Sequence, residues 1–116
     1  MPNHFSSTAI LVTSDGLGHA EPELGHKLAR NYFHTMLELE QRPQSILFYG
    51  EGVRLTTKGS PCLNELTALS AAGVPLVVCR TCLDHYGLTD SVAVGEIGNM
   101  LRIVEAQAVA QKVITV

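Results

Sequence analysis

The stretch PLVVCRTCLDHYGL, residues 75–88, passes from an apolar run into two closely spaced cysteines. The run is apolar at every position after Pro75, which is typical of a strand covered on both faces in a parallel sheet. The residues that follow it predict a short helix that ends near Gly87. Cys79 and Cys82 therefore straddle the point where a buried strand passes into a helix.

The rest of the chain repeats this alternation between short apolar runs and longer helical patterns. Further strands are predicted over residues 8–13, 45–49, 92–94 and 113–116. Helices are predicted over residues 22–40, over 61–72 with Ser60 as the cap, and over 100–111 with Asn99 as the cap. Residues 53–58 fit either extended structure or a short helix. This order predicts one α/β domain over residues 1–116, with a mainly parallel sheet flanked by helices.

The helix predicted over residues 22–40 carries a broad apolar stripe. Its apolar residues recur at helical spacing near one face: Leu24, Leu28, Tyr32 and Leu39, widened by Phe33, Met36 and Leu37. The spacing predicts an amphipathic helix.

Composition excludes several classes of function. The 116 residues are 46% apolar and 16% charged, with a net charge of −3 and no cluster of Lys and Arg. Nucleic-acid binding needs a basic patch, so we expect no nucleic-acid partner. The sequence has no apolar run of membrane-spanning length and no signal peptide at its start, so we expect a cytoplasmic protein. Three cysteines, an odd number, fit a reducing compartment.

Chemistry-bearing residues converge on one predicted edge of the sheet. Ligands of open parallel sheets bind outside the carboxyl ends of the strands. Cys79 ends one strand, and two loops follow the other two central strands: Ser14, Asp15, Gly16 and Gly18 in one, Gly50 and Gly52 in the other. These loops are candidate pocket loops, because glycine lets a ligand approach the backbone closely.

The two cysteines are candidate catalytic residues. A thiol becomes a good nucleophile when a helix N-terminus or a nearby cation favours its thiolate. Arg80 is adjacent to Cys79, and His85 lies one helical turn beyond Cys82, so both are candidates for supporting a thiolate. Cys62 follows a proline in a helical first turn and is expected to be a core residue.

Other interpretations of the cysteine motif are weaker. A zinc site needs four ligands, whereas Cys79, Cys82 and His85 supply three at most, so we expect no metal. A thioredoxin-type pair follows the first strand of its unit and opens a long helix, unlike the pair here. The loop over residues 14–18 lacks the Lys-Ser/Thr ending of a phosphate-binding loop. No cofactor is expected.

The motif CRTCLDHYGL, residues 79–88, resembles the C-G-T-C-x-x-x-x-G-[LI] signature of the DsrE-like sulfur-relay proteins. Three other stretches are similar to the DsrE-like domain of the YedF group of sulfurtransferase-like selenium metabolism proteins. They are SDGLGHAEPELGHKL (14–28), ILFYGEGVRLTTKGS (46–60) and VAVGEIGNM (92–100). The four stretches occur in the same order and cover most of the chain.

This resemblance implies a flavodoxin-like or Rossmann-like domain that assembles into homo-oligomers, as dimers, trimers or hexamers. It implies that Cys79 carries sulfur as a persulfide and passes it to a partner protein, while Cys82 matches a cysteine found in some branches. Arg80 stands where the motif usually has glycine. The TusA-like domain of the YedF group has no counterpart in these 116 residues, so donor and acceptor are expected to be separate proteins, a TusA-like carrier among them.

Three functions remain open from the sequence. The leading hypothesis is a sulfur-relay protein in which Cys82 can resolve a Cys79 persulfide to a disulfide. The second is a non-catalytic module whose glycine loops bind a small ligand or mediate assembly. The third is a dithiol redox protein that uses the Cys79/Cys82 pair.

Overall fold

The structure is a computed structural model that describes residues 2–116. Within this range, strands and helices alternate along the chain: β1 (Thr8–Val12), α1 (Pro22–Glu38), β2 (Ser45–Phe48), α2 (Leu63–Ala71), β3 (Leu76–Cys79), α3 (Arg80–Tyr86), β4 (Glu96–Gly98), α4 (Met100–Val109) and β5 (Lys112–Thr115). Two short 3₁₀ helices, η1 (Gly50–Thr56) and η2 (Thr89–Ser91), follow β2 and α3. The segment that the sequence left undecided is therefore mostly helical.

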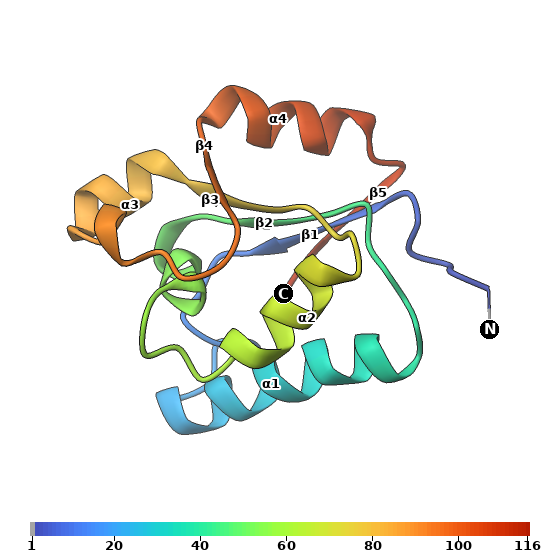
Figure 1. Cartoon of the computed structure of the whole chain (residues 1–116), viewed down its shortest axis with the longest axis horizontal. Helices are drawn as coiled ribbons and strands as arrows, with labels where there is room; N and C mark the ends of the chain where they lie inside the picture. Colours follow the sequence, from blue (N-terminus) through green and yellow to red (C-terminus); the bar gives the residue numbers. More distant parts are fainter. Residues whose placement is uncertain (1) are drawn as a thin grey trace.

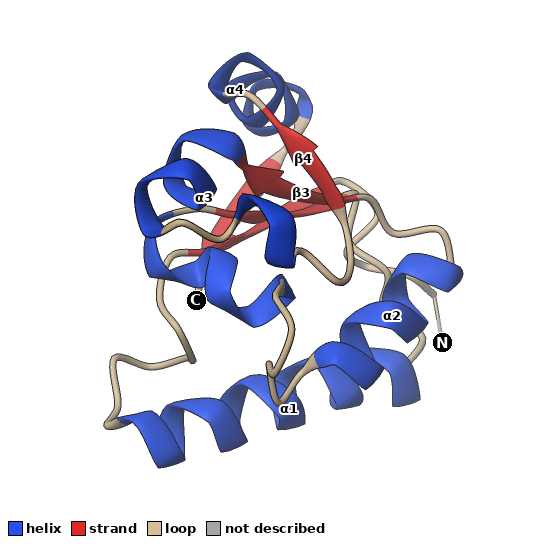
Figure 2. Ribbon diagram, turned by 60° about the vertical axis from the view of Figure 1, so that its left-hand side comes forward, coloured by secondary structure: helices blue, strands red, loops and turns tan. Residues whose placement is uncertain are grey.

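The strands form one parallel sheet in the order β4-β3-β2-β1-β5. Figure 1 shows α1 and α2 on one face of this sheet and α4 on the other, and Figure 2 shows the same layers from the side of α3. Helices on both faces explain why the central strands are apolar at nearly every position. The predicted fold class, a single α/β domain with a parallel sheet, is confirmed.

The hydrophobic core lies between the sheet and these helices. Every residue of β1, β2 and β3 is buried, and the largest side chains without exposed surface come from both the strands and the helices: Ile10, Ile46, Leu47, Phe48, Phe33, Leu66, Leu69, Leu83 and Ile103. This packed core therefore holds the carboxyl ends of β1, β2 and β3 in fixed positions relative to one another.

The apolar stripe of α1 is divided between the core and the surface. The residues of α1 that are buried against the body of the protein are Gly25, Ala29, Phe33 and Met36. Of the predicted stripe, Leu24, Leu28 and Leu39 remain 39–46% exposed. The small residues Gly25 and Ala29 let the backbone of α1 approach the protein closely, so the large leucines lie beside the contact.

Two details of the predicted elements are wrong. Residues 92–94 form no strand: Val92 makes an isolated antiparallel bridge with Thr57, and β4 lies at Glu96–Gly98. The backbone N–H of Ala93 donates to the carbonyl of Thr56 (2.8 Å), outside the sheet. The apolar residues 92–94 therefore pack against η1 and do not form part of the sheet.

The second detail is the start of α2. The helix begins at Leu63 with Cys62 as its cap residue, because the hydroxyl of Ser60 accepts from the N–H of Cys62 (3.1 Å) and closes a turn before the helix. The predicted cap of α4 is confirmed, since Asn99 Oδ1 accepts from the N–H of Arg102 (3.0 Å).

Candidate functional site

The two cysteines of the motif lie at the carboxyl edge of the sheet. Cys79 is the last residue of β3 and the cap residue of α3, and its side chain is fully buried. Cys82 is in the first turn of α3 and is partly exposed. The helix ends at Gly87, whose φ of +69° is a left-handed conformation that glycine adopts without strain. One buried thiol therefore lies beside one accessible thiol.

The turn after β2 contacts this pair. The backbone N–H of Gly50 donates a hydrogen bond to Sγ of Cys82, with a donor–acceptor distance of 3.1 Å. Gly52 holds the turn in place, because its Cα lies so close to β1 that an added Cβ would meet the carbonyl oxygen of Val12 at 2.1 Å. At Gly52, therefore, it is the backbone of β1, and not a ligand, that makes the close approach which glycine permits.

The surroundings raise the pKa of the Cys82 thiol. The main cause is burial, which disfavours the charged thiolate. The hydrogen bond from the N–H of Gly50 acts in the opposite direction, and the interaction with the Cys79 side chain raises the pKa further.

Side chains of η1 and α3 form the rim of the site. The guanidinium of Arg54 lies 4.7 Å from the centre of the Tyr86 ring and forms an ion pair with Glu51. Partial burial and the Glu51 carboxylate raise the pKa of the Tyr86 phenol, and Cys82 contributes to the same shift. Sequence reasoning missed this group. The Glu51–Arg54 spacing of three residues was the available signal, because it becomes an ion pair once the segment is helical.

Comparison with known proteins places the chain in a family. A family model described as "DsrE/DsrF-like family" matches residues 7–116. The chain belongs to the DsrE/DsrF-like family. A search of the curated proteins finds no significant match.

Two solved structures share the fold of this DsrE/DsrF-like chain. The YchN protein of E. coli is 20% identical with a TM-score of 0.65, and the match covers 95% of this chain and 99% of that one. MTH1491, a protein of unknown function from Methanobacterium thermoautotrophicum, is 20% identical with a TM-score of 0.67, and the match covers 94% of this chain and 97% of that one. At this identity the likeness establishes the fold alone.

The two predicted supports of a thiolate lie on the outside of α3. Arg80 and His85 are exposed, and neither side chain makes a hydrogen bond or ion pair with another of the described residues. The ring of His85 instead packs edge-to-face on Tyr86, with the centroids 5.1 Å apart. Their role in stabilising a thiolate stays a prediction.

The loop after β1 is tied to α1. The carboxylate of Asp15 pairs with Nε2 of His26 (3.2 Å), and the N–H of Leu17 donates to the carbonyl of Gly25 (3.0 Å). Gly16 lies against the same turn, where an added Cβ would meet the backbone carbon of Gly25 at 2.8 Å. Of the predicted pocket loops, the structure brings Gly50 to the cysteines and holds residues 14–18 against α1.

The third cysteine is a core residue. Cys62 is fully buried, and burial, followed by the charge of Glu65, raises the pKa of its thiol to about 12. It is therefore inert as a nucleophile at neutral pH. Within residues 2–116, no group of three or more His, Cys, Asp or Glu side chains is arranged to hold a metal ion. None of the helices described there is long and apolar enough to cross a membrane.

Proposed function

We propose that this DsrE/DsrF-like protein carries sulfane sulfur as a persulfide on the Cys79/Cys82 pair and passes it to a partner protein. The family is associated with sulfur relay, and the arrangement of the two thiols supports a relay in this chain. The observation that carries the proposal is the contrast between them: Cys79 is fully buried, whereas Cys82 is partly exposed and accepts a backbone hydrogen bond.

The contrast in burial assigns a different task to each thiol. A thiolate of another protein cannot reach the Cys79 sulfur in this conformation, because no part of that residue contacts solvent. Cys82 is therefore the entry point, and Cys79 is the protected store that the family resemblance indicates. A persulfide held at a buried site is shielded from the oxidants and thiols of the solvent.

The transfer balances as two thiol exchanges. Sγ of Cys82 attacks the terminal sulfur of the donor's persulfide, the S–S bond of the donor breaks, and the donor cysteine leaves and takes up the Cys82 proton. Sγ of Cys79 then attacks the terminal sulfur on Cys82, which gives a Cys79 persulfide and a free Cys82. Delivery reverses these steps with the acceptor's cysteine. Alternatively, Cys82 attacks Sγ of Cys79, releases hydrosulfide and leaves a disulfide.

Sulfur uptake by cysteine variants tests this scheme. Reduced protein is incubated with a cysteine desulfurase and cysteine, and intact masses are measured under non-reducing conditions. We expect the wild type and Cys79→Ser to gain one sulfur atom and Cys82→Ser to gain none. Cys62→Ser is the matched control and should load normally. Normal loading of Cys82→Ser would refute the proposal.

The same experiment separates the relay from a dithiol redox protein. A redox pair would form a Cys79–Cys82 disulfide by losing two hydrogen atoms, that is two protons and two electrons that an oxidant such as dissolved oxygen accepts, and would gain no sulfur. Under the relay proposal, a disulfide appears only after sulfur has been loaded, together with released hydrosulfide. The order of the two products therefore decides between the functions.

We also propose that the donor, the acceptor and further copies of the chain bind as separate partners. The likeness to the YedF group supports a TusA-like acceptor and extends the cargo to selenium as a sulfur analogue. Self-association is supported by the outer face of α4, where Leu101 and Val104 are 65% and 52% exposed. Light scattering after chromatography should give a multiple of the 12.5 kDa chain mass, and a monomer would contradict self-association.

A further inference from the structure

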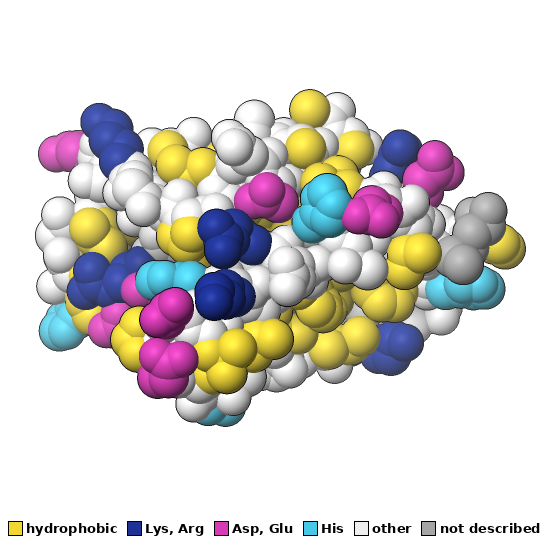
Figure 3. Space-filling model, turned by 90° about the horizontal axis from the view of Figure 1, so that it is seen from below, with side chains coloured by type: hydrophobic (Ala, Val, Ile, Leu, Met, Phe, Trp, Pro, Cys, Tyr) yellow, Lys and Arg dark blue, Asp and Glu magenta, His cyan; other side chains and the backbone are white. Residues whose placement is uncertain are grey.

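A groove of about 550 Å³ runs along α1, on the face of the sheet that α1 and α2 cover. Figure 3 looks onto this face and shows a patch of hydrophobic side chains bordered by charged ones. The groove is lined by α1 together with the N-terminal segment, the loop after β1 and the end of the chain. These lining elements do not include η1 or α3, so the groove is separate from the cysteines.

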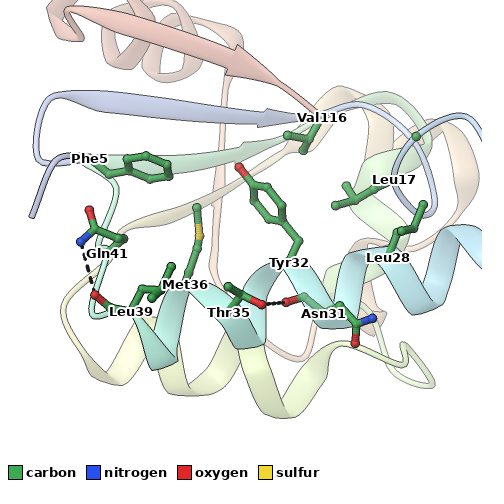
Figure 4. Close-up of a pocket in the computed structure, with 11 residues that line it drawn as sticks. Phe5, Leu17, Leu28, Asn31, Tyr32, Thr35, Met36, Leu39, Gln41 and Val116 are labelled. Carbon is green, nitrogen blue, oxygen red and sulfur yellow. Dashed lines mark hydrogen bonds between the residues drawn. The ribbon is translucent and has the colours of Figure 1, made fainter.

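The walls of the groove are almost wholly apolar. Figure 4 shows the side chains that line it, with Tyr32 standing between Phe5 and Val116, Leu28 near the middle of α1 and Leu39 just after the end of the helix. Leu28 and Leu39 belong to the stripe of α1 that is not used in the core. Leu39 follows Leu28 by eleven positions, so the groove is about 16–17 Å long at 1.5 Å per residue of helix.

Two polar side chains of the groove, Gln41 and Thr35, form hydrogen bonds within the protein. Gln41 is engaged on both sides of its amide, because Oε1 accepts from the N–H of His4 (2.8 Å) and Nε2 donates to the carbonyl of Pro2 (2.9 Å). The hydroxyl of Thr35 donates to the carbonyl of Asn31 (2.6 Å). The phenol of Tyr32, by contrast, forms no hydrogen bond with any other of residues 2–116.

The Tyr32 hydroxyl is a neutral group that points into the groove. Figure 4 shows it directed away from α1, between Phe5 and Val116. Burial raises the pKa of this phenol above its usual value of 10.0, so it stays protonated at neutral pH and can both donate and accept. Among residues 2–116, no Asp, Glu, Lys or Arg lines the groove.

We propose that this groove is a binding site for an uncharged, mostly apolar small molecule with one hydrogen-bonding group, which pairs with the hydroxyl of Tyr32. The volume lies within the 300–1,000 Å³ typical of small-molecule sites. A charged ligand would lose its hydration in the groove without gaining an opposite charge. An apolar ligand is favoured, because it removes the apolar side chains of the groove from contact with water. The site does not depend on the proposed sulfur relay and uses none of its residues.

A neutral fluorescent probe tests this site in the full chain. N-phenyl-1-naphthylamine is uncharged, has one N–H and fluoresces strongly in apolar surroundings. We expect saturable binding with one probe per chain, confirmed by native mass spectrometry. Absence of saturable binding would overturn the proposal.

Variants of the wall and of the hydroxyl locate the binding. Leu28→Glu places a charge in the groove and should weaken binding at least tenfold. Tyr32→Phe removes the hydroxyl and leaves the ring, so it should weaken binding about fivefold, equivalent to the ~1 kcal/mol of one net hydrogen bond. Val109→Glu is the matched control, because Val109 is exposed near the end of α4, on the other face of the sheet, and neither lines the groove nor belongs to the pair Leu101 and Val104.

The outcomes separate a ligand site from an interface between copies. If Leu28→Glu lowers the oligomer mass in light scattering while probe binding persists, the groove holds a second copy and the proposal is wrong. Equal weakening by Val109→Glu would show unspecific binding and would also overturn the proposal. Tyr32→Phe keeps the test decisive if Leu28→Glu fails to fold, which circular dichroism would reveal.

Discussion

Replacing Gly52 with alanine tests the packing that brings η1 to the cysteines. The added Cβ would lie 2.1 Å from the carbonyl oxygen of Val12 and 2.7 Å from its carbonyl carbon, both of which are backbone atoms. The distance to the oxygen is about 1.3 Å shorter than the 3.4 Å at which ordinary contact begins. Neither β1 nor the turn can relieve this by rotating a side chain, so the backbone of η1 has to move.

The expected cost follows from that displacement. Overpacking of a rigid site costs about 1–3 kcal/mol, and a backbone clash lies at the upper end. Movement of η1 also withdraws the N–H of Gly50 from Sγ of Cys82. Gly52→Ala should therefore lower the free energy of unfolding by about 3 kcal/mol and further raise the pKa of Cys82.

Urea denaturation and the pH dependence of alkylation measure the two effects. The matched control is Gly25→Ala, the same chemical change in α1, where the new Cβ would have its nearest contact at 3.5 Å. That variant should be stabilised by about 0.5–1 kcal/mol through helix propensity. Equal stability of Gly52→Ala and the wild type would refute the packing account of η1.

Three further predictions concern single side chains. Cys79→Ala should lower the pKa of Cys82, because Cys79 raises it, so alkylation of Cys82 near pH 8 should become faster; a slower reaction would contradict the assigned cause. Burial raises the pKa of the Cys62 thiol from 9.0 to about 12. The stabilisation from burying this neutral thiol is therefore complete below pH 9 and is lost as the pH rises toward 12, where the unfolded chain is favoured because its thiol ionises first. Between these values the wild type should lose roughly 1.4 kcal/mol per pH unit more than Cys62→Ala in urea denaturation, and parallel pH profiles would contradict this. Asn99→Ala should cost about 1 kcal/mol by removing the cap of α4, measured by thermal unfolding; an unchanged melting temperature would show that the cap is unimportant.

The fold could be predicted because the buried strands leave a strong signal in the sequence. The run that ends at Cys79 is apolar because both faces of β3 are covered, and the order of strands and helices then limits the topology. The strand β4 escaped detection because it is three residues long, lies at an edge and includes the exposed Glu96. The neighbouring Val92 and Val94 mimic a strand because they pack toward the core from a loop.

The sequence did not indicate which face of α1 is buried, because small residues contribute to that face. Gly25 and Ala29 carry almost no hydrophobic signal, yet they are among the residues of the helix that are buried against the protein. The larger leucines dominate the helical pattern and line the groove. Hydrophobic periodicity therefore identified the helix, whereas residue size decided which face is buried.

The candidate site could be predicted in part. The cysteine spacing and the rule for parallel sheets placed the pair at the correct edge. The hydrogen bond from Gly50 to Cys82 joins residues 32 positions apart, and the Arg54–Tyr86 contact likewise joins η1 to α3. Such contacts depend on the tertiary arrangement of two turns, which no local pattern encodes.

The route of sulfur through the two cysteines is the most direct test of the account. Arg80 lies between the cysteines, so trypsin separates them into the peptides 59–80, with Cys79, and 81–102, with Cys82. Cys62 shares the first peptide and is replaced by serine for this measurement. After brief exposure to the donor and trapping with iodoacetamide, the added sulfur should appear first on peptide 81–102 and later on peptide 59–80. Sulfur that never appears on either peptide, or that appears on peptide 59–80 at the same rate in Cys82→Ser, would contradict the relay through Cys82.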